Sequence, residues 1–355
     1  MSINNCTGAG IQTIGIIGEG KMGTGIFYFL LDFPFTLRWI GSSSADLEKL
    51  KQSLGKKLNR SLKAGLIDQR TYENKLVRTV ISNDLQLVAD CDLVIEAVNE
   101  DLDLKKELFV QLDKSIPQAS ILASNSSSIT PSRLFVSEPR NPYIIGLHYF
   151  YPVQLKNIVE VILTDRTSGE VRSRIEDFLS STGKQYLLLN ESTAFILNKL
   201  FLDVQNEAFR IVDQGVIGFG GMDRLVKETL FPFGVFDFMD SVGIDTMLAS
   251  VLNYTSGYPH QDYFAALIAK LTSLTGTGKL GIKSGEGFYD YRESQPQQSK
   301  PDPDLPEKIR AEIAGHLKNT YLSAAKRFTM QSKCSIDEMN HAVKEYFGIE
   351  KGPFE

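Results

Sequence analysis

Cysteine is scarce in this chain of 355 residues, which contains three: Cys6, Cys91 and Cys334. They lie far apart and form no Cys-x-x-Cys pair. This pattern argues against a structural zinc site and indicates a reducing compartment. We therefore expect a cytoplasmic protein with no metal ion.

Long apolar runs and an excess of positive charge are also missing. No apolar stretch approaches the roughly 18 residues that a membrane-spanning helix needs. The N-terminus does not resemble a signal peptide, and the chain ends in Gly-Pro-Phe-Glu rather than a peroxisomal tripeptide. A net charge of −5 argues against a nucleic-acid partner. With 42% hydrophobic and 23% charged residues, we expect a globular chain of about two or three domains.

A glycine-rich turn follows the first apolar segment. Residues 12–17 have the pattern of a buried strand, and an apolar helical segment begins near residue 26. A strand, a glycine turn and a helix N-terminus in this order hold the pyrophosphate of a dinucleotide. The sequence therefore predicts a Rossmann-type α/β domain whose cofactor loop comprises Gly18, Glu19, Gly20, Lys21, Met22 and Gly23.

The next predicted strand, at 36–40, ends without an acidic residue. Gly41 and Ser42 stand where NAD-binding domains place the acid that binds the ribose hydroxyls. Without that acid a 2′-phosphate is no longer repelled, and serine hydroxyls could bind one. The cofactor prediction is therefore NAD or NADP.

A histidine and a glutamate lie on two predicted neighbouring strands in residues 144–163. His148 ends the first strand and Glu160 lies within the second, with a proline-containing turn between them. A carboxylate on one imidazole nitrogen fixes the tautomer and stabilises the imidazolium, so the pair is suited to proton transfer. The alternative is a buried histidine with an ordinary hydrogen bond.

Lysines and arginines recur in the polar stretch at 46–70. Helical spacing places several of them on one side. They form either a solvated face or a docking surface for an anionic substrate tail, for which Lys57 and Lys63 are the candidates.

The ordered motifs together resemble the 3-hydroxyacyl-CoA dehydrogenase family over about residues 12–291. They are the glycine loop, Val-Ile-Glu-Ala-Val-Asn-Glu at 94–100, Ala-Ser-Asn-Ser-Ser-Ser at 123–128, Gly-Leu-His-Tyr-Phe-Tyr-Pro at 146–152, Val-Glu-Val at 159–161, Phe-Ile-Leu-Asn at 195–198 and Gly-Glu-Gly-Phe-Tyr at 285–289. The resemblance implies a doubly wound Rossmann domain, then an all-α domain. It also implies reversible oxidation of a 3-hydroxyacyl thioester by hydride transfer to a nicotinamide.

The resemblance also implies residue roles. His148 matches the general base and Glu160 its carboxylate partner, while Ser127 and Asn198 match residues that contact the substrate oxygen. The positions that match cofactor contacts are Glu100, Lys105, Ser127 and Lys283.

Departures from the family pattern point to the substrate. Tyr151 replaces an asparagine that follows the histidine motif, so a nicotinamide or substrate contact changes there. Ala194 and Val235 replace family residues where the helical domain covers the acyl pocket. We expect the reaction type to be retained and the substrate to differ.

Four segments are predicted along the chain. They are a Rossmann domain at 1–190, a helical domain at 191–291, a Pro-rich linker at 292–306 and a partial repeat of the helical domain at 307–355. The repeat is indicated because Ile336-Asp337 and residues 352–355 echo Met222-Asp223 and residues 234–237. Since helical domains dimerise in single-copy members of the family, a tandem copy leaves both a monomer and a homodimer open.

Several functional readings remain open. The substrate is an acyl thioester of CoA, or of acyl carrier protein as in polyketide pathways. The alternatives are a dehydrogenase of a small free hydroxy acid and an inactive nucleotide-binding relative.

Overall fold

The computed structural model describes residues 10–134, 137–256, 261–292 and 305–355. The chain divides into two compact units, Met1–Ala194 and Phe195–Glu355. Cys6 and most of the predicted linker, residues 293–304, lie outside the described residues.

The first unit contains an eight-stranded sheet in the order β3-β2-β1-β4-β5-β6-β7-β8. All neighbouring strands are parallel except β6 and β7, which are antiparallel. The strands are β1 (Thr13–Ile17), β2 (Thr36–Ile40), β3 (Thr79–Ser82), β4 (Leu93–Glu96), β5 (Ile121–Ser124), β6 (Ile144–Tyr149), β7 (Ile158–Leu163) and β8 (Gln185–Asn190). This topology confirms the predicted doubly wound Rossmann-type fold.

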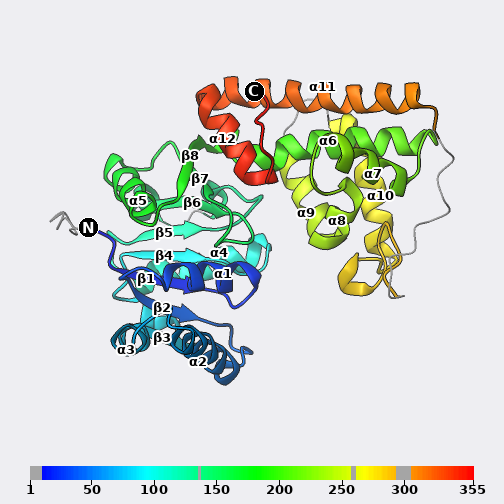
Figure 1. Cartoon of the computed structure of the whole chain (residues 1–355). Helices are drawn as coiled ribbons and strands as arrows, with labels where there is room; N and C mark the ends of the chain where they lie inside the picture. Colours follow the sequence, from blue (N-terminus) through cyan, green and yellow to red (C-terminus); the bar gives the residue numbers. More distant parts are fainter. Residues whose placement is uncertain (1–9, 135–136, 257–260, 293–304) are drawn as a thin grey trace. The chain divides into compact units, whose positions relative to one another are not determined.

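Helices cover both faces of this sheet because its central strands are apolar on both sides. Ile14 and Ile16 of β1 face a core shared with α1, α2 and α5, whereas Ile17 faces a second core shared with α4. Figure 1 shows α2 and α3 beside the β2 and β3 end of the sheet. The helices are α1 (Lys21–Leu30), α2 (Leu47–Lys63), α3 (Gln69–Val77), α4 (Leu102–Ser115) and α5 (Gly169–Ser181).

The carboxyl ends of five parallel strands meet at one edge of the sheet. β1 runs into the glycine turn, β2 into Gly41, β4 into the loop at 97–101 and β5 into the serine loop at 125–128. β6 is parallel to β5 and ends at Tyr149, so His148 lies at this edge too. Ligands of open α/β sheets bind at such an edge.

The second unit is built from helices around α6. Its helices are α6 (Ile196–Asp213), α7 (Phe219–Thr229), α8 (Val235–Val242), α9 (Ile244–Thr255), α10 (Ala265–Gly276), α11 (Glu307–Ser332) and α12 (Ile336–Phe347). The long helix α11 packs alongside α6, and α12 contacts both helices (Figure 1). Phe347 of α12 stacks on Phe231 with ring centroids 4.1 Å apart, and Phe201 of α6 meets it edge-on. This aromatic contact anchors α12 to the rest of the unit.

Candidate active site

The turn between β1 and α1 contains glycines that are needed for different reasons. Gly18 has a φ of +114°, and a Cβ there would lie 2.5 Å from the Ala97 carbonyl oxygen. A Cβ on Gly23 would lie 2.1 Å from the Gly18 carbonyl oxygen, so this glycine lets α1 pack on the turn. A Cβ on Gly20, in contrast, would meet nothing within 4 Å.

Gly20 therefore leaves open space beside the backbone at the start of α1. Gly20 stands at the N-cap of this helix, which Lys21 and Met22 begin, and it has no side chain that could cap the first amides. Free amides and the helix dipole attract an anion, and only a residue without a Cβ allows a close approach. These residues fit the pyrophosphate of a nicotinamide dinucleotide.

An acidic side chain reaches the end of β2 even though residue 41 is glycine. The Glu19 carboxylate accepts hydrogen bonds from the backbone amide and the hydroxyl of Ser42, at 3.0 and 2.6 Å. Partial burial raises the pKa of Glu19, but the two hydrogen bonds from Ser42 outweigh it, and the pKa is lowered overall. The sequence did not indicate that Glu19, rather than residue 41, supplies a carboxylate here.

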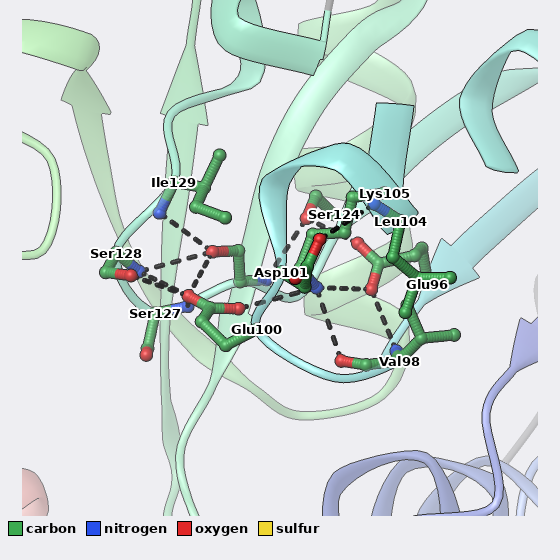
Figure 2. A network of polar contacts seen from close by, with 11 residues as sticks. Glu96, Val98, Glu100, Asp101, Leu104, Lys105, Ser124, Ser127, Ser128 and Ile129 are labelled. Carbon is green, nitrogen blue, oxygen red and sulfur yellow. Dashed lines mark hydrogen bonds and ion pairs between the residues drawn. The ribbon is translucent and has the colours of Figure 1, made fainter. Parts of the chain in front are cut away.

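Lys105 lies at the centre of a buried ion-pair network (Figure 2). Its ammonium is 2.5 Å from a Glu96 carboxylate oxygen, 3.4 Å from Glu100 and 3.3 Å from the Val98 carbonyl oxygen. Lys105 is fully buried, so it holds the acidic side chains after β4 in place and is itself covered. The predicted cofactor contacts of Lys105 and Glu100 stay predictions, and in the structure these two residues pair with each other.

Glu100 organises the serine loop that follows β5. One carboxylate oxygen accepts hydrogen bonds from the amides of Ser127 and Ser128 and from the hydroxyls of Ser126 and Ser128. Burial raises the pKa of Glu100, but the Lys105 charge and the serine hydroxyls outweigh it and hold that pKa below its ordinary value. Figure 2 shows the Ser127 hydroxyl pointing away from this carboxylate.

His148 and Glu160 face each other across the antiparallel strands β6 and β7. They are directly paired in the register, and His148 Nδ1 lies 2.8 Å from a Glu160 carboxylate oxygen. Glu160 is completely buried and His148 is nearly so. The two side chains predicted to pair therefore do so, and the Glu160 carboxylate faces Nδ1 of the imidazole.

Asn125 connects the serine loop to the histidine strand. Its side-chain oxygen accepts a hydrogen bond from the Tyr149 amide at 3.0 Å, directly after His148. This contact places Ser127 and His148 on two segments that are tied together. Asn125 was not among the predicted site residues, although it lies between serines at the end of a predicted strand.

Asn198 lies in the second unit and is held by two tyrosines. Its amide nitrogen donates to the Tyr254 hydroxyl at 2.9 Å, and its amide oxygen accepts from the Tyr346 hydroxyl at 2.8 Å. Because the amide nitrogen has an acceptor and the amide oxygen has a donor, the orientation of the Asn198 amide is defined. Tyr346 belongs to α12, which the sequence analysis did not connect with Asn198.

The remaining predicted site residues are more exposed. Lys57 and Lys63 lie on the exposed surface of α2, where the Lys57 ammonium is 4.9 Å from the centre of the Tyr28 ring. Tyr151 is 59% exposed in the turn after β6. Lys283, in the second unit, pairs with Asp245 at 2.5 Å.

Two family models match successive parts of the chain. The NAD-binding domain of 3-hydroxyacyl-CoA dehydrogenase matches residues 13–192, and the C-terminal domain of the same enzyme matches residues 195–291. The chain belongs to the 3-hydroxyacyl-CoA dehydrogenase family. As a member of this family it is a nicotinamide-dependent oxidoreductase, which confirms the class of enzyme and cofactor expected from the motifs.

Relatives of known name match most of the chain. It is 34% identical over 278 residues to a probable 3-hydroxybutyryl-CoA dehydrogenase of Deinococcus radiodurans, covering 78% of this chain and 99% of the relative. The structure of (S)-3-hydroxybutyryl-CoA dehydrogenase from Ralstonia eutropha is 29% identical, with a TM-score of 0.70 over 80% of this chain and all of the other.

A further solved structure shares the fold of almost the whole chain. The 3-hydroxybutyryl-CoA dehydrogenase from Escherichia coli K12 has a TM-score of 0.80 at 21% identity and covers 97% of this chain and 90% of its own. The fold shared with known members of the dehydrogenase family therefore continues past residue 291, where the family match ends.

Among the described residues, no helix is long and apolar enough to cross a bilayer.

Proposed function

We propose that this chain catalyses the reversible oxidation of a 3-hydroxyacyl-CoA thioester to its 3-ketoacyl form. The observation that carries the proposal is the buried His148–Glu160 pair, which lies at the same sheet edge as the glycine turn. Relatives named 3-hydroxybutyryl-CoA dehydrogenases favour a short acyl group.

The histidine pair supplies proton transfer in this reaction. When bound, the nicotinamide accepts the hydride from the carbon that bears the hydroxyl group. His148 Nε2 takes the hydroxyl proton, because Nδ1 faces the Glu160 carboxylate 2.8 Å away. The charge on Glu160 then stabilises the imidazolium, and the buried setting strengthens that attraction.

The serine loop and the glycine turn provide binding groups. We assign the Ser127 hydroxyl to the substrate oxygen, because the family pattern implies that role and Glu100 fixes the Ser127 amide. The amides that begin α1 bind the pyrophosphate. Asn198 and Lys283 keep the roles that the family pattern implies for them, as oxygen ligand and cofactor contact.

The exposed cations of α2 support CoA as the carrier. Lys57 and Lys63 lie on one helix, and a CoA thioester carries nucleotide phosphates that such cations attract. An acyl carrier protein lacks this nucleotide.

Consumption of NADH and NADPH with acetoacetyl-CoA tests the proposed function. We expect turnover with acetoacetyl-CoA and a much lower kcat/KM with free acetoacetate or with acetoacetyl-carrier protein. Preference for the carrier-protein substrate would contradict the CoA assignment. Turnover of free acetoacetate alone would favour a hydroxy-acid dehydrogenase, and cofactor binding without any turnover would favour an inactive relative.

We infer that residues 307–355 are a partial second copy of the helical domain. In the first copy, Asp223 accepts hydrogen bonds from the amides of Val235 and Phe236, and a Cβ on Gly234 would lie 2.3 Å from its carboxyl carbon. At the end of the chain, Asn340 accepts from the Phe354 amide, and a Cβ on Gly352 would lie 2.5 Å from its amide oxygen.

These hydrogen bonds suggest a different counterpart for Asp223 in the second copy from the one that the sequence pattern indicated. Asp337, which the sequence pattern set opposite Asp223, is exposed at the start of α12. We therefore take Asn340, one helical turn later, as the counterpart of Asp223, because Asn340 accepts a hydrogen bond from the segment that follows Gly352.

Replacing Tyr346 by phenylalanine tests whether the second copy supports the reaction. The variant loses the hydrogen bond to the Asn198 amide oxygen but keeps the ring that packs on Phe347. We expect kcat to fall about tenfold, because the Asn198 amide is no longer held in one orientation. Steady-state kinetics with acetoacetyl-CoA measure the effect, and NADH affinity and melting temperature should stay near wild type.

Tyr321 offers a matched control in α11. Its buried hydroxyl finds no hydrogen-bond partner among the residues that the structure describes. Tyr321→Phe should therefore leave kcat unchanged. An equal effect of both substitutions would show that Tyr346 does not position Asn198.

A further inference from the structure

The donors at the end of β2 are the groups that would hold a 2′-phosphate. In a Rossmann domain, the residue after this strand meets the adenosine ribose, where NADP carries its extra phosphate. Here that region offers a backbone amide and a hydroxyl, both from Ser42. Amides and hydroxyls are typical ligands of a phosphate oxygen.

Both of these Ser42 donors are already hydrogen-bonded to the Glu19 carboxylate. One carboxylate oxygen accepts from the Ser42 amide and the other from its hydroxyl, and that hydroxyl also lies 3.2 Å from the Ser44 hydroxyl. The hydrogen bonds and the lowered pKa keep Glu19 ionised at neutral pH. A permanent anion built into the protein therefore takes the place where a phosphate would be recognised.

Gly41 is consistent with this arrangement. A Cβ on residue 41 would lie 2.7 Å from the Ala45 side chain and 3.7 Å from a Glu19 carboxylate oxygen. An acid at position 41 would thus be crowded by Ala45 and would face a second negative charge. The carboxylate is supplied from the glycine turn instead of from the end of β2.

We propose that Glu19 makes this enzyme select NAD(H) over NADP(H). Its carboxylate accepts the hydrogen bonds of the adenosine ribose hydroxyls and repels a 2′-phosphate by charge and by occupying the Ser42 donors. The inference rests on the proposed function only in requiring that the glycine turn binds a nicotinamide dinucleotide.

Trp39 provides a readout of binding that does not depend on turnover. It is the single tryptophan of the chain, and its indole nitrogen donates to the Gly18 carbonyl oxygen at 2.9 Å. A reduced nicotinamide dinucleotide whose pyrophosphate binds at the turn should quench the Trp39 fluorescence. Titration with NADH and NADPH then gives both dissociation constants for the full-length chain, without substrate.

Glu19→Gln and Glu19→Ala are the test variants. Gln keeps an oxygen that can accept from Ser42 but removes the charge, whereas Ala also releases the Ser42 donors. We expect wild type to bind NADH at least about tenfold more tightly than NADPH, since like charges in close contact are costly. In both variants the ratio of the NADPH to the NADH dissociation constant should fall by about tenfold or more. The gain in NADPH affinity should be larger for Glu19→Ala than for Glu19→Gln.

The control is Glu73→Gln, which changes the net charge equally at an exposed position on α3. Its ratio of the NADPH to the NADH dissociation constant should equal that of wild type. Tight binding of both cofactors by wild type, or an unchanged ratio in both Glu19 variants, would overturn the role of Glu19 while leaving the dehydrogenase assignment intact. No quenching by either cofactor would overturn the cofactor role of the turn and this inference with it.

Discussion

Replacing Lys105 by methionine should lower the free energy of unfolding of the first unit by about 3 to 5 kcal/mol. Methionine fills similar space but leaves Glu96 and Glu100 without the cation between them. Glu96 is 1% exposed, so water cannot replace the lost ammonium. For a unit of this size the melting temperature should fall by about 10 °C, which circular dichroism would measure.

Two further variants show whether the buried charge causes this loss. Lys106→Met removes the neighbouring lysine, which is exposed on the same helix, and should change the melting temperature little. Adding Glu96→Gln to Lys105→Met should restore part of the stability, because one uncompensated carboxylate is removed. Equal stability of the Lys105 and Lys106 variants would contradict the role given to the network.

Replacing His148 by asparagine should lower kcat about a hundredfold to ten-thousandfold while NADH still binds. The asparagine amide can donate to Glu160 from near the position of Nδ1, so the buried carboxylate keeps a partner. What the variant lacks is a second nitrogen that can accept a proton. Kinetics with acetoacetyl-CoA and NADH, compared with Trp39 quenching, would separate chemistry from binding.

The chain contains a second histidine–glutamate pair that serves as a control. His316 Nε2 lies 2.9 Å from a Glu207 oxygen in the second unit, and the His316 side chain is 54% exposed. His316→Asn should leave kcat within about twofold of wild type, because surface ion pairs contribute little. A comparable loss in the two variants would show that the His148 effect is not specific proton transfer.

The histidine pair was predictable because it depends on local pattern. Two β-branched segments joined by a short turn must lie side by side, and β-pairing then fixes which residues face each other. His148 and Glu160 meet directly in that register. The glycine turn was equally predictable, because the positive φ of Gly18 and the close approach of Gly23 to the Gly18 carbonyl both arise within one strand–turn–helix segment.

The roles of Lys105 and Glu19 were less accessible. The family resemblance implies a cofactor contact for Lys105, but no pattern in the sequence shows that its ammonium lies between Glu96 and Glu100. Glu19 lies in a cofactor motif, and the pattern gives no reason for its side chain to cross to Ser42. In both cases the role depends on a side chain from one element reaching a residue of another element.

The sequence by itself determined the Rossmann-type domain, the dinucleotide turn, the helical domain and the family, since these follow from periodicity and ordered motifs. The tertiary structure decided which charge stands at the end of β2, which cation supports the serine loop and which tyrosines hold Asn198. Tyr346 lies 148 positions after Asn198, so their contact exists only because α12 packs against α6. Hydrogen bonds between distant segments depend on how helices and strands pack, and no local pattern of residues specifies that packing.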